Sequence, residues 1–331
     1  MSRARLTLDL QVAGRQVGDL LIPWSDDRNP LGRYPVPVIT VSGTPGPVVL
    51  ILGGVHGDEF EGPAAIMRLA RDLAPDALRG RVVMIPAANA PAFAASRRCS
   101  ALDGGNLNRA FPGDADGTPT AMIADWLQTW MIPRCDAVID LHSGGKASVF
   151  VPSSLPQAGI SPALDAANAD LALAFGLPVI WQLGAQNDDR SVNAACARAG
   201  VACIAAELGG GGGVDPDVTD MAEAGLRRVL HHLGVIASAP PPGPQANATR
   251  VELSDPADHV MAPARGLFDR RCHAGARVAS GDLAGWLHFP EDPTRTPVAL
   301  RFPQAGLVLA HTARGLVDRA EMLALVARDI G

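Results

Sequence analysis

The sequence predicts an α/β fold in which helices flank a mixed or parallel sheet, followed by a smaller antiparallel β domain. Two observations support this prediction. Short runs rich in Val and Ile, bounded by Gly, Pro or Asn, alternate with segments of helical periodicity, as in an α/β domain. Beyond a Pro-rich stretch, glycines instead separate short alternating runs, which is typical of antiparallel strands.

The strand-like runs are short and apolar enough to be buried on both faces of a sheet. They lie at Val48–Leu52, Val82–Ile85, Ala137–Ile139, Pro178–Trp181 and Val201–Ala206. The helical segments repeat apolar residues at the intervals that place them on one helix face. They lie at Pro63–Leu73, Ala121–Met131, Ala163–Ala174 and Asp217–Leu233.

A chain of 331 residues predicts more than one hydrophobic core. The sequence pattern changes from helical periodicity to short alternating runs, and this change locates the boundary between two predicted domains. Residues 1–235 form the predicted α/β domain. Residues 236–250, which include ASAPPPGPQANAT, form the predicted linker, because the segment lacks periodicity. Residues 251–331 form the predicted β domain, with Gly306–Ala310 as one alternating run. Helical character returns only at Arg319–Arg328.

Composition limits the classes of partner. The net charge is -6 and the 28 Lys and Arg are scattered, which disfavours nucleic acid. The N-terminal segment lacks an apolar signal region, and the apolar runs are too short to span a bilayer. A cytoplasmic protein without a membrane partner is therefore expected. Five cysteines with irregular spacing and no C-x-x-C predict reduced thiols rather than a cysteine zinc site.

Residues that bear chemistry follow three of the predicted strands. His56 and Glu59, spaced as H-x-x-E, follow the first; His142 and Glu207 follow two others. Ligands of open α/β sheets bind beyond the carboxyl ends of the strands, so these side chains are expected to converge. Two imidazoles and a carboxylate are a familiar ligand set for catalytic zinc, which activates water and polarises a carbonyl. The alternatives are a His bonded to backbone and a Glu favouring a helix N-terminus.

Three further acids surround this predicted site. Asp58 is the rival of Glu59 as a ligand, although a helix N-cap is the favoured interpretation. Asp140 is either a partner that orients a ligand His or a structural acid at a strand end. Glu207 is the candidate general base and acid, because burial would raise its pKa; the alternative is a buried salt bridge.

A loop rich in Gly and Asn carries the predicted substrate contacts. Arg109 with Asn108 can hold a carboxylate, and Asn106 is a further candidate beside them. Upstream, Arg97 and Arg98 can place a cation near a developing oxyanion. The asparagines can equally be turn-formers, and either upstream arginine a solvated side chain.

Ser143 is predicted to line the pocket or to bond backbone. It is not a serine nucleophile, because Leu141 stands where the nucleophile elbow requires glycine.

Four segments together resemble the succinylglutamate desuccinylase and aspartoacylase family, which shares its catalytic domain with zinc carboxypeptidases. They are GGVHGDEFEGP (53–63), NLNRAFPG (106–113), DLHSGG (140–145) and AELGGGG (206–212). The resemblance implies a zinc-carboxypeptidase-like mixed sheet for the larger domain, which would then be a zinc hydrolase domain. It implies one Zn2+ per chain, held by His56, Glu59 and His142.

The same resemblance assigns roles around the metal. It implies Glu207 as the proton shuttle, with Asn108 and Arg109 at the substrate carboxylate. Arg98 is the nearest match to the oxyanion arginine of the family, at a longer spacing from the Asn-Arg pair. The single tyrosine, Tyr34, lies outside the predicted β domain. A site that uses a tyrosine of that domain, as in aspartoacylase activity, is therefore not copied here.

One branch of the family is more similar than the others. The double glycine before NLNR, the AELGGGG run and the stretches APARGLFD and GDLAGWLHFPED resemble the branch that deacetylates N-alpha-acetyl-L-2,4-diaminobutyrate in bacterial ectoine breakdown. Such a substrate carries a free ammonium, which an acid should meet. Three acids remain open for that role: Asp103, Asp188 and Asp189.

The expected activity is zinc-dependent hydrolysis of the amide bond of an N-acylated small amino acid, with the diaminobutyrate derivative preferred. The alternatives are another N-acyl-amino-acid deacylase of the aspartoacylase or desuccinylase type, a zinc carboxypeptidase acting on peptides, and a non-catalytic binder. The expected partner is a small-molecule substrate, and a homo-oligomer is left open.

Overall fold

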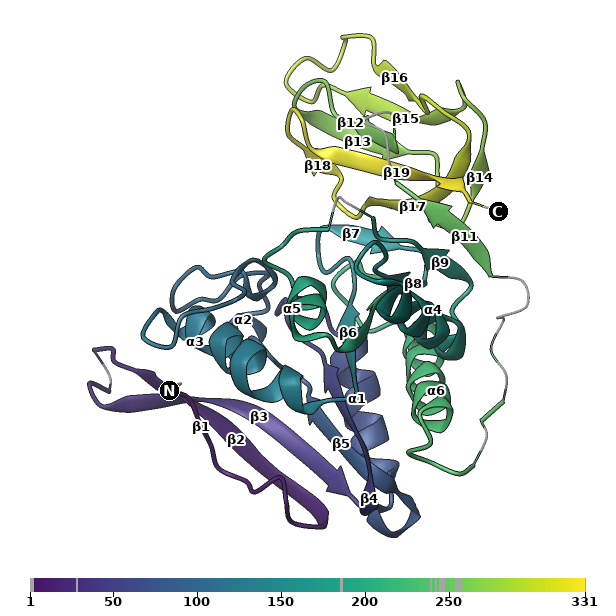
Figure 1. The fold of residues 1–331 in the computed structure, drawn as a ribbon. Helices are drawn as coiled ribbons and strands as arrows, with labels where there is room; N and C mark the ends of the chain where they lie inside the picture. The colour runs from purple at the N-terminus through teal and green to yellow at the C-terminus, as the bar shows by residue number, and fades with distance from the viewer. Residues whose placement is uncertain are drawn as a thin grey trace.

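The computed structural model describes residues 3–27, 29–184, 187–238, 240–241, 243, 248–253 and 258–330. It confirms the predicted fold class (Figure 1). Helices cover both faces of a large mixed sheet, and a β-rich part containing a small antiparallel sheet lies beyond one end of it.

The helices are α1 (Glu61–Asp72), α2 (Ala90–Ala94), α3 (Pro119–Trp126), α4 (Pro162–Phe175), α5 (Val192–Ala199) and α6 (Pro216–His232). The strands of the large sheet are β1 (Arg5–Leu6), β2 (Gly14–Trp24), β3 (Gly32–Ser42), β4 (Thr44–Leu52), β5 (Arg79–Ile85), β6 (Ala137–His142), β7 (Ser148–Phe150), β8 (Ser153–Pro156), β9 (Val179–Trp181), β10 (Ala202–Glu207), β11 (Thr249–Glu252), β12 (His259–Met261), β14 (Arg277–Val278), β17 (Gly306–Thr312) and β19 (Met322–Asp329). The small sheet contains β13 (Gly266–Arg270), β15 (Leu283–His288), β16 (Val298–Arg301) and β18 (Leu316–Val317).

The central strand β4 divides the core of the α/β part into two layers. Val49 and Ile51 pack in a cluster with residues of α1, α4 and α6. Leu50 and Leu52 pack in another cluster with residues of α3 and α5. Because successive side chains of a strand point to opposite faces, an unbroken apolar run produces a strand that is buried on both sides.

The strands that carry the predicted site are parallel neighbours. β4 pairs with β6, and β6 pairs with β10, both in parallel. Their register places Leu52 beside Asp140 and His142 beside Glu207. The carboxyl ends of these strands therefore meet at one edge, as the sequence predicts.

The strands from β11 onward belong to both sheets, because β11, β12, β14, β17 and β19 continue the large sheet while the other four form the small one. β7, which lies before residue 235, pairs with β17, and β11 lies between β9 and β19. β11 begins at Thr249, inside the predicted linker. Residues 239, 242 and 244–247 of that linker lie outside the described residues.

The helical interpretation of Arg319–Arg328 is wrong. The segment forms β19, which pairs with β17 and β12. Ala324 and Val326 enter one apolar cluster, whereas Leu325 and Ala327 enter another. Burial on both faces of a paired strand overrides the helix propensity of its Ala, Leu and Arg residues.

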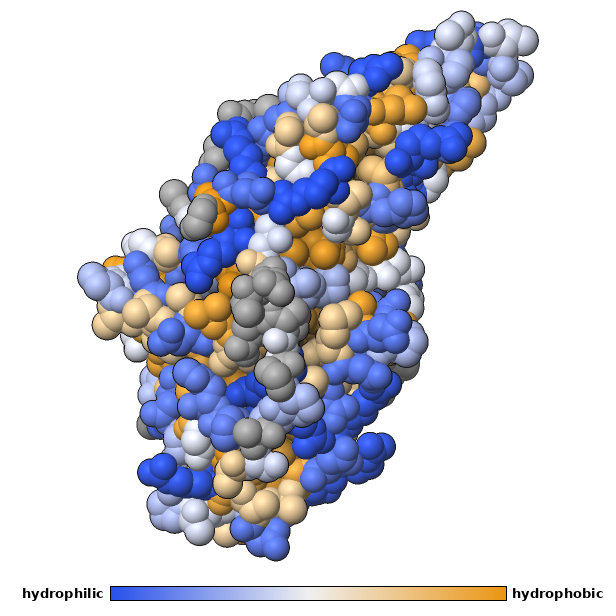
Figure 2. All heavy atoms as spheres, turned by 90° about the vertical axis from the view of Figure 1, so that its right-hand side faces the viewer, coloured by the Kyte–Doolittle hydropathy of each residue, from blue (hydrophilic) through white to orange (hydrophobic). Residues whose placement is uncertain are grey.

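Polar and apolar residues are mixed on the face shown in Figure 2. On the face shown in Figure 2, hydrophilic residues cover much of the surface and apolar residues form interspersed patches. Within the described part of the chain, none of the helices combines the length and the apolar character needed to cross a bilayer.

Candidate active site

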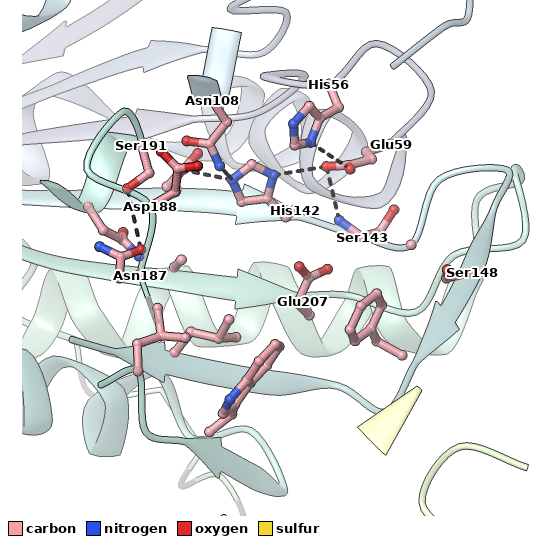
Figure 3. A pocket seen from close by; sticks show the side chains of 18 of the residues that line it. His56, Glu59, Asn108, His142, Ser143, Ser148, Asn187, Asp188, Ser191 and Glu207 are labelled. Carbon is pink, nitrogen blue, oxygen red and sulfur yellow. Dashed lines mark hydrogen bonds and ion pairs between the residues drawn. The ribbon is translucent and has the colours of Figure 1, made fainter. Parts of the chain in front are cut away.

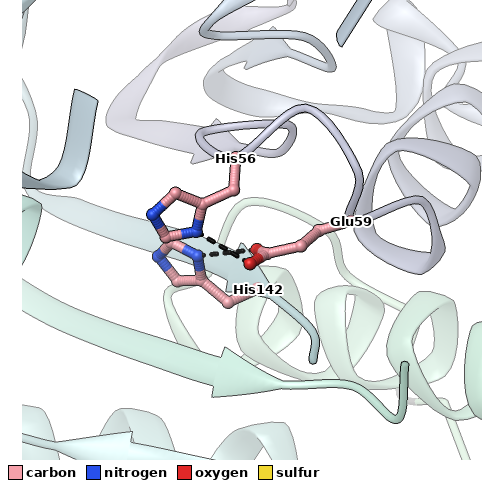
Figure 4. Close-up of side chains that lie close together, drawn as sticks. All are labelled: His56, Glu59 and His142. Atoms are coloured by element: carbon pink, nitrogen blue, oxygen red, sulfur yellow. Dashed lines mark hydrogen bonds and ion pairs between the residues drawn. The ribbon is translucent and has the colours of Figure 1, made fainter. Parts of the chain in front are cut away.

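His56, Glu59 and His142 form a buried group at the edge where β4 and β6 end. The Glu59 carboxylate lies 2.8 Å from His56 Nδ1 and 3.0 Å from His142 Nδ1, through different oxygens. Figure 4 shows both rings turning a nitrogen toward this carboxylate. One ligand atom from each residue lies within 4.8 Å of the others, so the three can hold one metal ion.

The other nitrogen of each ring contacts an oxygen. His56 Nε2 lies 3.1 Å from Asn106 Oδ1, and His142 Nε2 lies 2.8 Å from Asp140 Oδ2. When each Nε2–H donates to its oxygen, the lone pairs on Nδ1 face the Glu59 carboxylate. A cation between these acceptors satisfies all of them, and such outer contacts are usual for metal-ligating histidines. The donor set therefore fits a divalent metal, with two nitrogens and a carboxylate.

Burial and charge act in opposite directions on this group. Burial raises the pKa of Glu59, but His56 and His142 outweigh it and bring that pKa to about 2. Burial lowers the pKa of His142, but Asp140 and Glu59 raise it well above its usual range. Glu59 is thus held as a carboxylate, the form that binds a metal.

Two more groups contact the Glu59 carboxylate. The backbone N–H of Ser143 donates to Glu59 Oε2 over 3.2 Å. Arg98 Nη1 lies 3.4 Å from Glu59 Oε1 and 3.4 Å from His56 Nδ1. Ser143 and Arg98 both line the adjoining pocket. Arg97 is not among the lining residues; its carbonyl accepts a hydrogen bond from Gly57.

Glu207 lies across the pocket from the metal-binding group, at the end of β10 (Figure 3). Its Oε2 is buried and has no hydrogen-bond partner among the described residues. Burial raises the pKa of Glu207 to about 8, and the negative charge of Glu59 adds to the rise. The alternative interpretation of Glu207 was a buried salt bridge. Among the described residues, the ion pairs at this site involve Glu59 and not Glu207.

The raised pKa of Glu207 predicts a dependence of stability on pH in the metal-free protein. Its pKa is about 8 in the folded state against an ordinary value of 4.5. The contribution to stability is fully present below pH 4.5 and is lost as the pH rises through 8, because the unfolded chain releases the proton first. We expect Glu207→Gln to remove this loss. Melting curves are measured with chelator between pH 4.5 and 8. The melting temperature of Glu207→Gln, relative to that of the wild type, should rise across this range; a difference that does not change with pH would contradict the prediction.

Asn108 and Arg109 both line the pocket from a 3-10 turn at Leu107–Arg109. Leu107 is fully buried and anchors the turn. Asn108 Oδ1 accepts a hydrogen bond from the N–H of Val192, the first residue of α5, and Asn108 Nδ2 lies 3.4 Å from His142 Nε2. The bond to α5 therefore fixes the turn beside the metal-binding group.

The structure assigns different contacts to three of the predicted residues. Asn106 caps the turn and contacts His56, and it is not among the residues that line the pocket. Asp58 is not the helix N-cap, because that position belongs to Phe60; its Oδ2 instead accepts from the N–H of Lys146. Asp103 accepts hydrogen bonds from the backbone N–H groups of Thr120 and Gly105, and it is not among the residues that line the pocket.

The pocket has a volume of about 590 Å³, and sequence reasoning missed much of its wall. Its apolar side includes Phe150 and Trp181, whose rings stack 6.3 Å apart, together with Leu155, Leu183 and Leu253. Its polar side includes Asn187, Asp188, Ser191 and Asn193. The Ser191 side chain caps α5 by accepting a hydrogen bond from the N–H of Ala194. A serine at this position favours a helix start, and it is the sequence signal for α5, a helix that was not predicted.

The chain matches known proteins over nearly its whole length. The family model described as succinylglutamate desuccinylase/aspartoacylase catalytic domain matches residues 45–233. The N-alpha-acetyl-L-2,4-diaminobutyric acid deacetylase of Halomonas elongata is 33% identical, over 98% of this chain and 94% of that protein. The product-bound structure of the ectoine utilization protein EutE (DoeB) from Ruegeria pomeroyi is 34% identical with a TM-score of 0.94, covering 99% of each chain. The succinylglutamate desuccinylase/aspartoacylase structure from Rhodobacter sphaeroides is 35% identical with a TM-score of 0.93, covering 99% of this chain and 100% of that one.

Proposed function

The chain belongs to the succinylglutamate desuccinylase/aspartoacylase family of metal-dependent deacylases, and on that premise we propose that it deacetylates N-alpha-acetyl-L-2,4-diaminobutyrate. The similarity to the Halomonas elongata deacetylase and to the ectoine utilization protein of Ruegeria pomeroyi supports this choice of substrate. The single observation that carries the proposal is the buried His56, Glu59 and His142 group facing Glu207, whose Oε2 has no hydrogen-bond partner among the described residues.

The metal in this proposal is zinc, held by His56 Nδ1, His142 Nδ1 and the Glu59 carboxylate. When bound, zinc supplies electrophilic activation of the scissile carbonyl and of the attacking water. Asn106 and Asp140 orient the two imidazoles by accepting from their Nε2 atoms.

Glu207 moves the proton. Its carboxylate takes a proton from the attacking water as the new C–O bond forms, and it returns that proton to the nitrogen as the C–N bond breaks. The products are acetic acid, which ionises to acetate, and the free amino acid, whose amine takes up the released proton; Glu207 is left as it began. Burial raises the pKa of Glu207 to about 8, which brings it close to neutral pH, where a group that both accepts and donates is most effective.

Two arginines bind the charges of the substrate. Arg98 lines the pocket beside Glu59 and donates to the oxyanion that develops on the acyl carbonyl. Arg109, with the amide of Asn108, holds the carboxylate of the amino acid. Ser143 helps to place the metal ligands through its backbone bond to Glu59, and it lines the pocket near the acyl group.

A substrate panel tests the proposal. Purified protein of known zinc content is incubated with N-alpha-acetyl-L-2,4-diaminobutyrate, N-acetyl-L-aspartate, N-succinyl-L-glutamate and short peptides, and mass spectrometry follows the free amino acids. We expect the highest kcat/KM for the diaminobutyrate derivative. Removal of C-terminal residues from peptides without deacetylation would instead identify a carboxypeptidase, and no turnover of any compound would leave only a binder.

Arg109→Ala is the informative variant within the panel. Because a charge-assisted bond to the carboxylate forms in the ground state, we expect KM to rise about 10- to 100-fold with a small change in kcat and unchanged zinc content. Arg265→Ala, which removes an exposed arginine paired with Asp318 of the β domain, is the matched control. Full activity of Arg109→Ala at low substrate concentration would refute its role at the carboxylate.

A further inference from the structure

A charged cluster outside the metal-binding group lies at one end of the pocket. Asp188 Oδ2 is 3.0 Å from Arg109 Nε, and the same carboxylate accepts two bonds from the Arg190 guanidinium, of 3.0 and 2.9 Å, and one from the Arg190 backbone N–H. Figure 3 places Asp188 with Asn187 and Ser191 at this end, whereas Ser143 and Ser148 lie at the other end. One carboxylate is therefore shared by two guanidinium groups.

The cluster restricts how Arg109 can meet a substrate. Arg109 Nη1 donates to the carbonyl of Asn108 over 2.6 Å, and Nε faces Asp188. Among the described residues, Nη2 has no hydrogen-bond partner and is left for a substrate carboxylate. Asp188 thus holds the guanidinium with one donor edge toward the pocket. The side chain of Asp188 is itself 26% exposed, so its charge is also felt there.

The balance of charge at this end is suited to one carboxylate. The charged side chains that line the described pocket, apart from the histidines, are Glu59, Arg98, Arg109, Asp140, Asp188 and Glu207. Arg98 lies against Glu59, so Arg109 is the remaining lining arginine. Arg190 is not among the lining residues, so at the pocket the Asp188 carboxylate faces Arg109 alone. With Arg190 counted, the cluster of two arginines and Asp188 keeps one net positive charge, which one substrate carboxylate neutralises.

We propose that Asp188 is a specificity-determining residue that restricts the site to amino acids with a single carboxylate. This inference rests on the proposed function, because it concerns the substrate of the same site. Asp188 neutralises one of the two guanidinium charges and repels a second carboxylate on the substrate. A substrate with a neutral or cationic side chain meets no such repulsion. Placing like charges together is an effective means of rejecting a wrong ligand.

Asp188→Asn tests the inference, because it removes the charge and nearly preserves the shape. The substrates are N-acetyl-L-aspartate, with two carboxylates, and N-acetyl-L-2-aminobutyrate and N-alpha-acetyl-L-2,4-diaminobutyrate, with one. We expect the wild type to favour the two monocarboxylates. In Asp188→Asn, the ratio of kcat/KM for the aspartate derivative to that for the aminobutyrate derivative should rise about tenfold or more, mainly through KM.

Two variants distinguish specificity from a merely structural role. Asp188→Glu keeps the charge and should keep the wild-type ratio. Asp189→Asn removes the same charge from the exposed neighbouring residue, which is not among those lining the pocket, and should also leave the ratio unchanged. An equal loss of kcat/KM for all three substrates in Asp188→Asn would overturn the inference, as would a wild type that prefers the aspartate derivative.

A binding measurement separates failure of this inference from failure of the proposed function. Calorimetry measures the affinity of the same three compounds for Glu207→Gln and for Glu207→Gln combined with Asp188→Asn. If the wild type hydrolyses none of the three, the proposed function fails, but the affinity ratios still decide the role of Asp188. A shift toward the dicarboxylate on loss of the Asp188 charge supports the inference, and unchanged ratios overturn it.

Discussion

Glu207→Gln is expected to lower kcat by about 100- to 10,000-fold while the zinc content stays that of the wild type. The substitution keeps the size of the side chain and removes its ability to exchange a proton. Glu207 lies opposite the metal-binding group, and its buried Oε2 has no other partner among the described residues. The loss should therefore fall on kcat, because the group acts when bonds form and break rather than when the substrate binds.

The control for this variant is Glu291→Gln, which removes an exposed carboxylate between β15 and β16 of the small sheet. Steady-state kinetics, zinc analysis and a melting curve are measured on both variants. Retention of more than a tenth of the wild-type kcat by Glu207→Gln would contradict the assignment of Glu207 as the proton shuttle. A loss of zinc together with activity would also contradict it, because it would make the residue a metal ligand.

The position of the site could be predicted because it depends on local rules. Apolar runs identify buried strands, and parallel strands bring their carboxyl ends to one edge. His142 and Glu207, which lie 65 positions apart in the sequence, are neighbours in the paired register of β6 and β10. The sequence left Asp140 open between a partner of a ligand histidine and a structural acid, and in the structure Asp140 Oδ2 lies 2.8 Å from His142 Nε2, two residues along the same face of the strand.

The rest of the pocket depends on packing that no local pattern records. Phe150, Trp181 and Leu253 come from three separate segments and meet only because β9 pairs with β11 and β7 pairs with β17. Asn106 was predicted either to contact substrate or to form a turn; it caps the turn, and the same oxygen contacts His56 Nε2. Such directions are set by tertiary contacts rather than by residue type.

Two errors at the level of secondary structure have different origins. α5 is short and rich in alanine, so its apolar face gives a weak periodic signal, although Ser191 caps it and alanine favours a helix. β19 contains good helix formers, yet it lies in a sheet between apolar clusters. In β19 the neighbours in space, rather than the intrinsic preferences, determine the conformation.

Replacing both His56 and His142 by Ala is expected to reduce the zinc content from about one per chain to near zero and to abolish turnover. Each histidine supplies one nitrogen to the group, and the remaining Glu59 carboxylate does not form a zinc site alone. The double variant also leaves the buried Glu59 carboxylate without its two imidazole neighbours, so we expect the variant to be less stable than the wild type.

The matched control is His311→Ala, because His311 is also buried but bonds the carbonyl of Thr312 in β17, outside the metal-binding group. Metal analysis and melting curves with and without added zinc are measured on wild type, control and double variant. Zinc should raise the melting temperature of wild type and control, since a ligand at a thousandfold excess over its Kd stabilises the folded state by about 4 kcal/mol. No rise is expected in the double variant. Because this readout needs no substrate, it tests the metal site apart from the reaction: a zinc-dependent rise in the double variant would place the ion elsewhere, whatever the activity.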